Sequence, residues 1–180
     1  MHPAFSVLIF TVTSGAGYGL LAWLGVGQLL GYTQAQTTDQ QIVVGVIAMV
    51  LVSIGLLSST MHLANPKNAW RSFSRFRTSW LSREAVFAIL LYPVAALYAA
   101  AIFWQWSCIN WLAGLSIVLA LVTLFSTSMI YASLKTIRQW NTPMVPALFM
   151  AYALSSGGLL FLAVSGLFGA LNSVLLSTVL

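Results

Sequence analysis

The chain has 180 residues, of which 60% are hydrophobic and 5% carry a charge. Soluble domains carry about 25% charged residues, so the charged side chains are too few to cover a water-facing surface, and a soluble protein is excluded. The net charge of +5 reports orientation in a membrane rather than nucleic-acid binding. Cys108 is the single cysteine, which excludes an intramolecular disulfide and a multi-cysteine metal or cluster site.

Five apolar segments follow one another along the chain, each long enough to cross a bilayer core of about 30 Å. Backbone groups in lipid must be paired within their own segment, and continuous apolar runs therefore favour helices. The sequence predicts an all-α integral membrane helical bundle that forms a single transmembrane domain over residues 1–180. The predicted spans are Phe5–Gly31, Gln41–Leu63, Arg83–Trp106, Leu112–Leu134 and Val145–Phe168. The apolar tail, Gly169–Leu180, predicts the start of a sixth span.

The connections between these spans alternate in charge. Residues 32–40 contain Asp39 and no base, and residues 107–111 carry no charge. The other two connections hold every Lys and Arg of the chain: Lys67, Arg71, Arg75, Arg77, Arg83, Lys135 and Arg138. The positive-inside rule then places the N-terminus and residues 64–83 in the cytoplasm, with the chain in the inner membrane. The other interpretation is a docking surface whose charge is set by a partner.

The segment from residue 64 to 82 alternates aromatic with basic side chains. Its aromatic residues recur every three or four positions: Trp70, Phe73, Phe76 and Trp80. This spacing predicts a cytoplasmic, amphipathic loop with a short helix lying in the membrane interface. Contact with anionic membrane lipid explains such a loop, and so does the docking of an extrinsic subunit.

The sequence GAGYG at residues 15–19 resembles a phosphate-binding loop superficially. No strand precedes it, and it lies inside a predicted span. Gly15 and Gly19 are four residues apart, a spacing that is typical of closely packed membrane helices. Packing is therefore the favoured interpretation, and Ser155–Gly158 in the fifth span is interpreted in the same way.

Two titratable residues lie near the cytoplasmic ends of neighbouring spans: His62 ends the second span, and Glu84 opens the third. Structural explanations exist for both. His62 would reach interfacial water, and Glu84 would lie in the first turn of a helix capped by Ser82 or pair with an arginine at position 71, 77 or 83. Because the two spans are antiparallel, however, His62 and Glu84 are expected to face one cavity. A base, an acid and several arginines beside an apolar slot suit a lipophilic, proton-coupled ligand such as a quinone.

Metal ligands are scarce in this sequence. A buried haem usually takes two axial ligands, and the second histidine, His2, lies in a terminal segment that is expected to fray. A haem is therefore disfavoured. His62 and Glu84 alone also fall short of the three or four ligands that zinc or iron would take. The sequence predicts no metal site in this chain.

Three stretches, in order, resemble the dimethyl sulfoxide (DMSO) reductase anchor-subunit family. They are HPAFSVLIFTVTSGAGYGL (2–20), STMHLANPKNAWRSFSRFRTSWLSRE (59–84) and MIYASLKTIRQWNTP (129–143). The resemblance covers most of the chain. It implies the membrane anchor, usually with about eight spans, of a complex with a molybdopterin catalytic subunit and an iron–sulfur subunit that carries four clusters. It also implies that the anchor holds no metal and binds a quinone, either ubiquinone or menaquinone.

The resemblance extends to single residues. His62 and Glu84, 22 residues apart, match the family's quinone-site histidine and acid, and Arg71 matches a basic residue implicated nearby. On this basis His62 and Glu84 are the predicted catalytic residues, and His62, Arg71 and Glu84 the predicted quinone-binding residues. His62 would hydrogen-bond a quinone oxygen and help to deliver its proton, and Glu84 would connect the site to cytoplasmic water. Arg71 would orient Glu84 or stabilise negative charge on the quinone.

The orientation separates two branches of the family. A cytoplasmic basic loop, together with the residues TSWLSRE (78–84), resembles the membrane subunit of the cytoplasm-facing sulfite dehydrogenase (quinone). DMSO reductase proper faces the other side. The predicted function is quinone-reactive anchoring in sulfite oxidation, and the alternative is the anchor of a DMSO or related reductase that oxidises quinol. Two other classes stay open: a purely structural anchor, and a small transporter, which the absence of a clear internal repeat and of a charge in mid-span disfavours.

Overall fold

The computed structural model describes residues 3–61, 73 and 75–167. This part of the chain is helical and contains no strand. The elements are α1 (Pro3–Leu29), η1 (Tyr32–Ala35), α2 (Thr38–Met61), α3 (Trp80–Trp104), α4 (Ile109–Ala132) and α5 (Met144–Leu167). Each of the five long helices is long and apolar enough to cross a membrane. The five predicted spans are confirmed, with ends that move by at most three residues, and the predicted sixth span lies outside the described residues.

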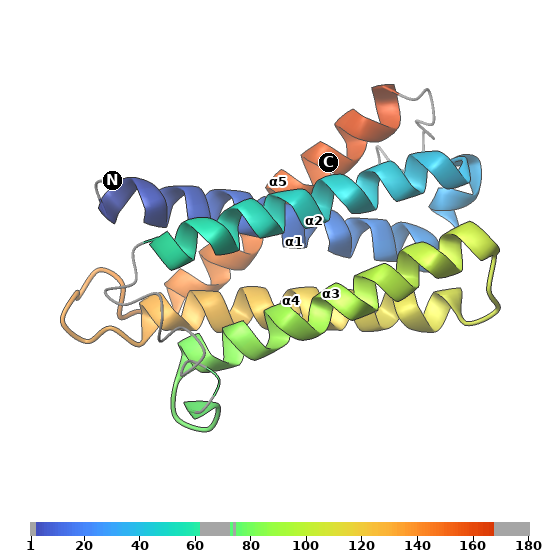
Figure 1. The fold of residues 1–180 in the computed structure, drawn as a ribbon. Coiled ribbons are helices and arrows are strands. Elements are labelled where there is room, and N and C mark those ends of the chain that lie inside the picture. The colour runs from blue at the N-terminus through green and yellow to red at the C-terminus, as the bar shows by residue number, and fades with distance from the viewer. Residues whose placement is uncertain (1–2, 62–72, 74, 168–180) are drawn as a thin grey trace.

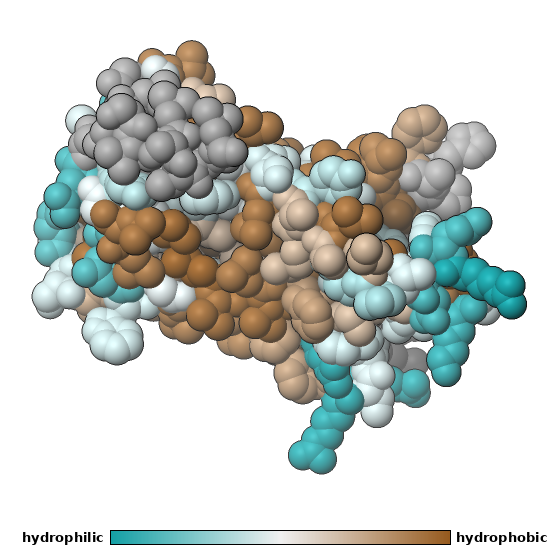
Figure 2. All heavy atoms as spheres, turned by 180° about the vertical axis from the view of Figure 1, so that it is seen from behind, coloured by the Kyte–Doolittle hydropathy of each residue, from teal (hydrophilic) through white to brown (hydrophobic). Residues whose placement is uncertain are grey.

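Helix α1 lies at the centre of the bundle (Figure 1). In its most apolar 18-residue window 61% of the residues are buried, compared with 28–44% in the other four helices. It packs against α2, α4 and α5, whereas α3 packs mainly against α4. On the face shown in Figure 2, hydrophobic side chains cover the middle and hydrophilic side chains gather toward the ends, as expected of a bundle surrounded by lipid.

Glycines allow α1 to approach three neighbouring helices closely. A Cβ atom at Gly17 would lie 2.7 Å from the carbonyl oxygen of Ala48 in α2, and one at Gly25 would lie 3.1 Å from that of Ala113 in α4. A Cβ atom at Gly19 would overlap the backbone of Ala153 in α5. Lipid tails compete with side chains for apolar contact, so close backbone approach is a main source of helix association in membranes. The packing interpretation of the GAGYG sequence is confirmed.

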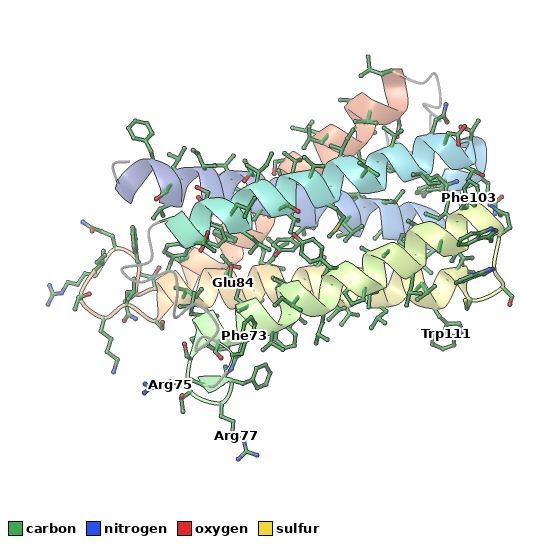
Figure 3. All side chains as sticks on the ribbon, viewed as in Figure 1. Phe73, Arg75, Arg77, Glu84, Phe103 and Trp111 are labelled. Carbon is green, nitrogen blue, oxygen red and sulfur yellow. The ribbon has the colours of Figure 1, made fainter. Side chains whose placement is uncertain are left out.

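The five basic residues in the described part of the chain lie at one end of the bundle, together with the N-terminal end of α1: Arg75, Arg77, Arg83, Lys135 and Arg138. Figure 3 shows Arg75 and Arg77 at that end, and Phe103 and Trp111 at the other. This arrangement agrees with the predicted alternation of the connections. Lys67 and Arg71 lie outside the described residues.

The described part of the predicted interfacial helix is not α-helical. Arg75 accepts backbone hydrogen bonds from Thr78 and Ser79, which turn the chain just before α3 begins. Trp80, the last aromatic residue of the predicted amphipathic loop, is instead the first residue of α3. Its ring packs edge-on against Phe125 of α4 at 5.8 Å, a contact that favours extending α3 back to this residue.

Gly19→Ala should destabilise the bundle, because the added methyl group would push α1 and α5 apart. Overpacking of this kind costs about 1–3 kcal/mol. Gly114→Ala is the matched control, since a Cβ atom there meets no atom within 4 Å while the gain in helix propensity is the same. Thermal unfolding in detergent, followed by tryptophan fluorescence, should show a lower midpoint for Gly19→Ala alone. Equal midpoints for the two variants would contradict this account of the packing.

Candidate functional site

Glu84 lies inside the bundle at its basic end, where α3 begins (Figure 3). The N-cap of α3 is Ser79, whose side chain makes no capping hydrogen bond, and Glu84 is the fifth residue of the helix. The predicted cap by Ser82 is therefore wrong: Ser82 lies within the first turn and is buried. Glu84 lies beyond that turn, where stabilisation by the helix dipole has fallen off, so the dipole does not explain this carboxyl group.

The carboxyl group of Glu84 is bound by a neighbouring helix. Its side chain is 3% exposed, and Thr127 of α4 donates a hydrogen bond from Oγ1 to Oε1 of Glu84 at 2.9 Å. The same hydroxyl lies 3.0 Å from the carbonyl oxygen of Thr123. Because a hydroxyl has one proton to donate, Thr127 divides it between the carboxyl group and its own helix. Within the described residues the other oxygen of Glu84 receives no hydrogen bond.

No ion pair of Glu84 with Arg77 or Arg83 is formed in the described part of the chain. Arg83 donates from Nε to the carbonyl oxygen of Phe76 at 3.0 Å and from Nη2 to that of Arg77 at 2.9 Å. Its guanidinium carbon also lies 4.1 Å from the ring centre of Trp80. Arg83 thus fastens the preceding turn to the start of α3 and leaves the carboxyl group without a positive partner among these residues.

His62 and Arg71 lie outside the described residues. Their proximity to Glu84, and with it the three-residue quinone site, stays a prediction. The described residues contain no group of three or more His, Cys, Asp or Glu side chains that could hold a metal ion.

Tyr18 of α1 is a buried polar residue that sequence reasoning missed. Its side chain is completely buried, and its hydroxyl group has no hydrogen-bond partner in the described part of the chain. The sequence does contain a signal for Tyr18, which is a tyrosine between two glycines of a predicted span. The glycines explain the helix packing, but they do not explain why a polar tyrosine lies between them.

A cavity of about 330 Å³ lies between α2 and α3, with α1 at its base. It runs from Ser53 and Tyr92, whose hydroxyl groups are 2.8 Å apart, toward Gln41 and Ile102 near the end of the bundle opposite the basic residues. Glu84 does not line it. Tyr92 follows Glu84 by eight residues, or about 12 Å along a helix, so this cavity and the buried carboxyl group occupy different depths.

The sequence of this bundle matches a known protein family. The profile of the family described as "DMSO reductase anchor subunit (DmsC)" matches residues 1–178. The chain belongs to this family. Membership of the DmsC family confirms the resemblance inferred from the sequence. It also agrees with the five apolar helices, each long enough to cross a membrane, in the described part of the chain.

Two curated relatives narrow the comparison within the DmsC family. A sulfite dehydrogenase subunit of Allochromatium vinosum is 33% identical over 94% of this chain and 57% of its own length. The anaerobic dimethyl sulfoxide reductase chain YnfH of Escherichia coli is 27% identical over 88% of this chain and 56% of its own length. The chain therefore spans a little over half the length of these relatives. No solved structure matched the chain.

Thr127→Val should destabilise the protein, because the carboxyl oxygen of Glu84 would stay buried without its donor. A buried polar group left without a partner costs about 1–3 kcal/mol. Thr123→Val is the matched control: Thr123 lies one turn earlier in α4 and donates to the carbonyl oxygen of Leu119 in its own helix. Thermal unfolding in detergent should show a larger loss for Thr127→Val, and Thr127→Ser should restore the wild-type midpoint. An equal effect of the two valine variants would argue against a contribution from the bond to Glu84.

Proposed function

We propose that this chain is the quinone-reactive membrane anchor of an oxidoreductase complex, most consistent with sulfite oxidation. A molybdopterin catalytic subunit would pass electrons through an iron–sulfur subunit to a quinone beside His62, Arg71 and Glu84. The observation that carries the proposal is the burial of Glu84, 3% exposed, without a positive partner in the described part of the chain. Burying a carboxyl group in a membrane is costly, and such groups are commonly functional.

The geometry of Glu84 suits proton exchange with a ligand. One oxygen is held by Thr127 at 2.9 Å, which fixes the orientation of the carboxyl group, while the other is available to exchange a proton. General acid–base groups need this combination of fixed position and a free site. In the proposal, His62 hydrogen-bonds one quinone oxygen, Glu84 exchanges protons with water on the basic side, and Arg71 orients Glu84.

The names of the relatives support an oxidoreductase complex, but they imply opposite directions of electron transfer between the complex and the quinone. The Allochromatium relative is a subunit of a sulfite dehydrogenase, which favours delivery of electrons to quinone. The Escherichia coli relative is a chain of a dimethyl sulfoxide reductase, and in a complex of that kind the same groups would receive protons from quinol. The higher identity to the former is the reason for placing sulfite oxidation first.

Orientation supports the same choice. Every Lys and Arg lies within residues 64–83 or 135–144 of the sequence, which are predicted to be on the side of the N-terminus, and the positive-inside rule makes that side cytoplasmic. The partner subunits would then dock on the cytoplasmic face, with the exposed side chains of Phe73, Arg75 and Arg77 at the docking surface. Contact of these side chains with anionic lipid is the simpler alternative.

Glu84→Gln should lower quinone-dependent turnover of the assembled complex by at least about 100-fold, the lower range for loss of a general acid–base group. Electron transfer to a soluble dye that accepts electrons from the partner subunits should be unchanged, because this route bypasses the anchor. The matched control is Asp39→Asn, which removes the chain's other carboxylate, located at the opposite end of the bundle. If quinone turnover survives both Glu84→Gln and His62→Ala, the chain is a structural anchor.

The single cysteine provides a test of orientation. Cys108 is exposed in the connection between α3 and α4, at the end of the bundle opposite the basic residues. A membrane-impermeant maleimide added to spheroplasts should label it. The matched variant carries Cys108→Ser and Gln139→Cys, which moves the thiol to an exposed position in the basic connection, and should be labelled only after the membrane is opened. The reverse pattern would place the basic loops outside the cytoplasm and exclude the sulfite-oxidising orientation.

A further inference from the structure

The hydroxyl group of Tyr18 is one of two buried hydroxyl groups in the basic half of the bundle, with that of Ser82, that have no hydrogen-bond partner in the described part of the chain. The side chain of Tyr18 is completely buried in the core of the bundle. A buried hydroxyl group without a hydrogen-bond partner lowers the stability of a protein. A hydroxyl group buried in the middle of a membrane helix needs a hydrogen-bond acceptor, and the described part of the chain does not provide one for Tyr18.

The packing of α1 fixes the direction in which Tyr18 points. Gly17 contacts α2, and Gly19 contacts α5, so Tyr18 projects between these two contact faces. Gly25 follows Tyr18 by seven residues, which is about two helical turns, and therefore lies on nearly the same face of the helix. Gly25 contacts Ala113 and Ile117 of α4, so Tyr18 also faces α4, further toward its C-terminal end.

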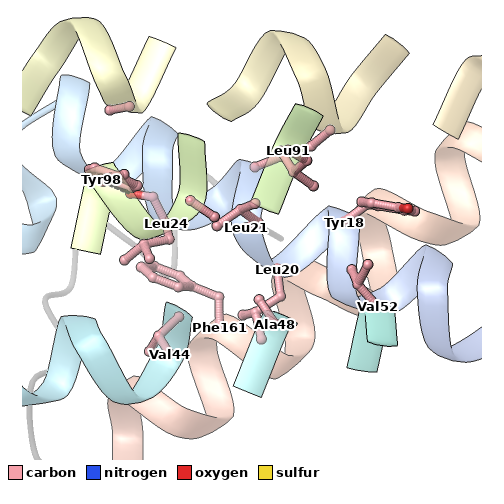
Figure 4. Packing of buried hydrophobic residues seen from close by; sticks show 14 of the residues in the cluster. Tyr18, Leu20, Leu21, Leu24, Val44, Ala48, Val52, Leu91, Tyr98 and Phe161 are labelled. Atoms are coloured by element: carbon pink, nitrogen blue, oxygen red, sulfur yellow. Dashed lines mark hydrogen bonds between the residues drawn. The ribbon is translucent and has the colours of Figure 1, made fainter. Parts of the chain in front are cut away.

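The same geometry brings Tyr18 to the depth of Glu84. Helices α1 and α4 are antiparallel, so moving back seven residues from Gly25 to Tyr18 corresponds to moving forward seven residues in α4, from Ile117 to Leu124. Side chains in a helix point toward its N-terminus, so the Tyr18 hydroxyl extends beyond that level toward Thr127, the partner of Glu84. In Figure 4 the oxygen of Tyr18 points away from Leu91 and Tyr98.

The register of the helices therefore places two groups with unmet hydrogen bonds at a similar depth of the bundle. Tyr18 has a proton to donate, and Glu84 has an oxygen without a donor in the described part of the chain. No direct hydrogen bond joins the two groups. A single oxygen atom placed between them would accept a hydrogen bond from Tyr18 and approach the free oxygen of Glu84.

We propose that Tyr18 is a further binding residue of the quinone site and donates a hydrogen bond to the ligand oxygen that exchanges its proton with Glu84. This inference rests on the proposed function. Tyr18 would be a hydrogen-bond donor to the ligand from within the core of the bundle, on the central helix α1. A bound water in place of the ligand oxygen is the alternative, and binding measurements separate the two.

The test compares Tyr18→Phe with Tyr98→Phe in the detergent-purified complex. Tyr98 is equally buried but donates to the backbone of Leu24 at 3.4 Å, and it lines the separate cavity between α2 and α3. The readouts are the dissociation constants of decylubiquinone and of a short-chain menaquinone, from quenching of tryptophan fluorescence, together with the thermal midpoint. Tyr18→Phe should weaken binding of the accepted quinone about 3- to 10-fold, the effect of one lost hydrogen bond. The midpoint of the protein without ligand should not fall, because the variant removes a buried hydroxyl group that lacks a partner. Tyr98→Phe should leave binding unchanged.

The other outcomes identify which proposal fails. If Glu84→Gln weakens binding and Tyr18→Phe does not, the quinone site stands and the role of Tyr18 is overturned in favour of a bound water. If Tyr18→Phe weakens binding and Glu84→Gln affects neither binding nor turnover, Tyr18 contacts the ligand and the proposed role of Glu84 falls. If Tyr98→Phe alone weakens binding, the ligand occupies the cavity between α2 and α3, and both assignments are overturned.

Discussion

The structure depends on how closely the backbone of α1 approaches its neighbours. Inside a membrane, burying apolar side chains against one another gains little over burying them against lipid, so association relies on close packing and on hydrogen bonds between helices. Gly17, Gly19 and Gly25 provide this close approach to α2, α5 and α4 respectively. Because the three contacts lie on different faces, they fix the rotation of α1 about its own axis as well as its position.

That rotation has a chemical consequence. With α1 held on three sides, Tyr18 has no other direction in which to project, and the tyrosine is directed toward the layer that holds Glu84 and Thr127. The hydrogen bond from Thr127 to Glu84 then ties α4 to α3 at the same depth. Burying a polar group at this depth of the membrane costs free energy. Here the glycine contacts that orient α1 and the hydrogen bond that holds Glu84 act in the same layer of the bundle.

Much of the fold could be predicted because bilayer thickness sets the length of an apolar helix, and all five spans follow from this constraint. Hydropathy does not, however, locate the first turn of a helix. α3 extends back to Trp80 through its contact with Phe125, which removes the expected cap at Ser82 and moves Glu84 out of the first turn. The hydrogen-bond partner of Glu84 could not be predicted from the sequence either. Thr127 is 43 residues away, and buried threonines usually donate to their own helix, as Thr123 does.

The connections explain why the cavity and the buried acid lie apart. Residues 105–108 join α3 to α4 directly, which holds these helices together along their length, and the short segment around η1 does the same for α1 and α2. Helices α2 and α3 are joined by the long stretch from residue 62 to 79, so they belong to different hairpins and touch less. The cavity opens between these hairpins, whereas Glu84 turns toward α4, its own hairpin partner. A ligand that reached Glu84 would therefore meet α1 and α4 as well as the two helices that flank the loop, and for this reason a residue of the central helix belongs among its contacts.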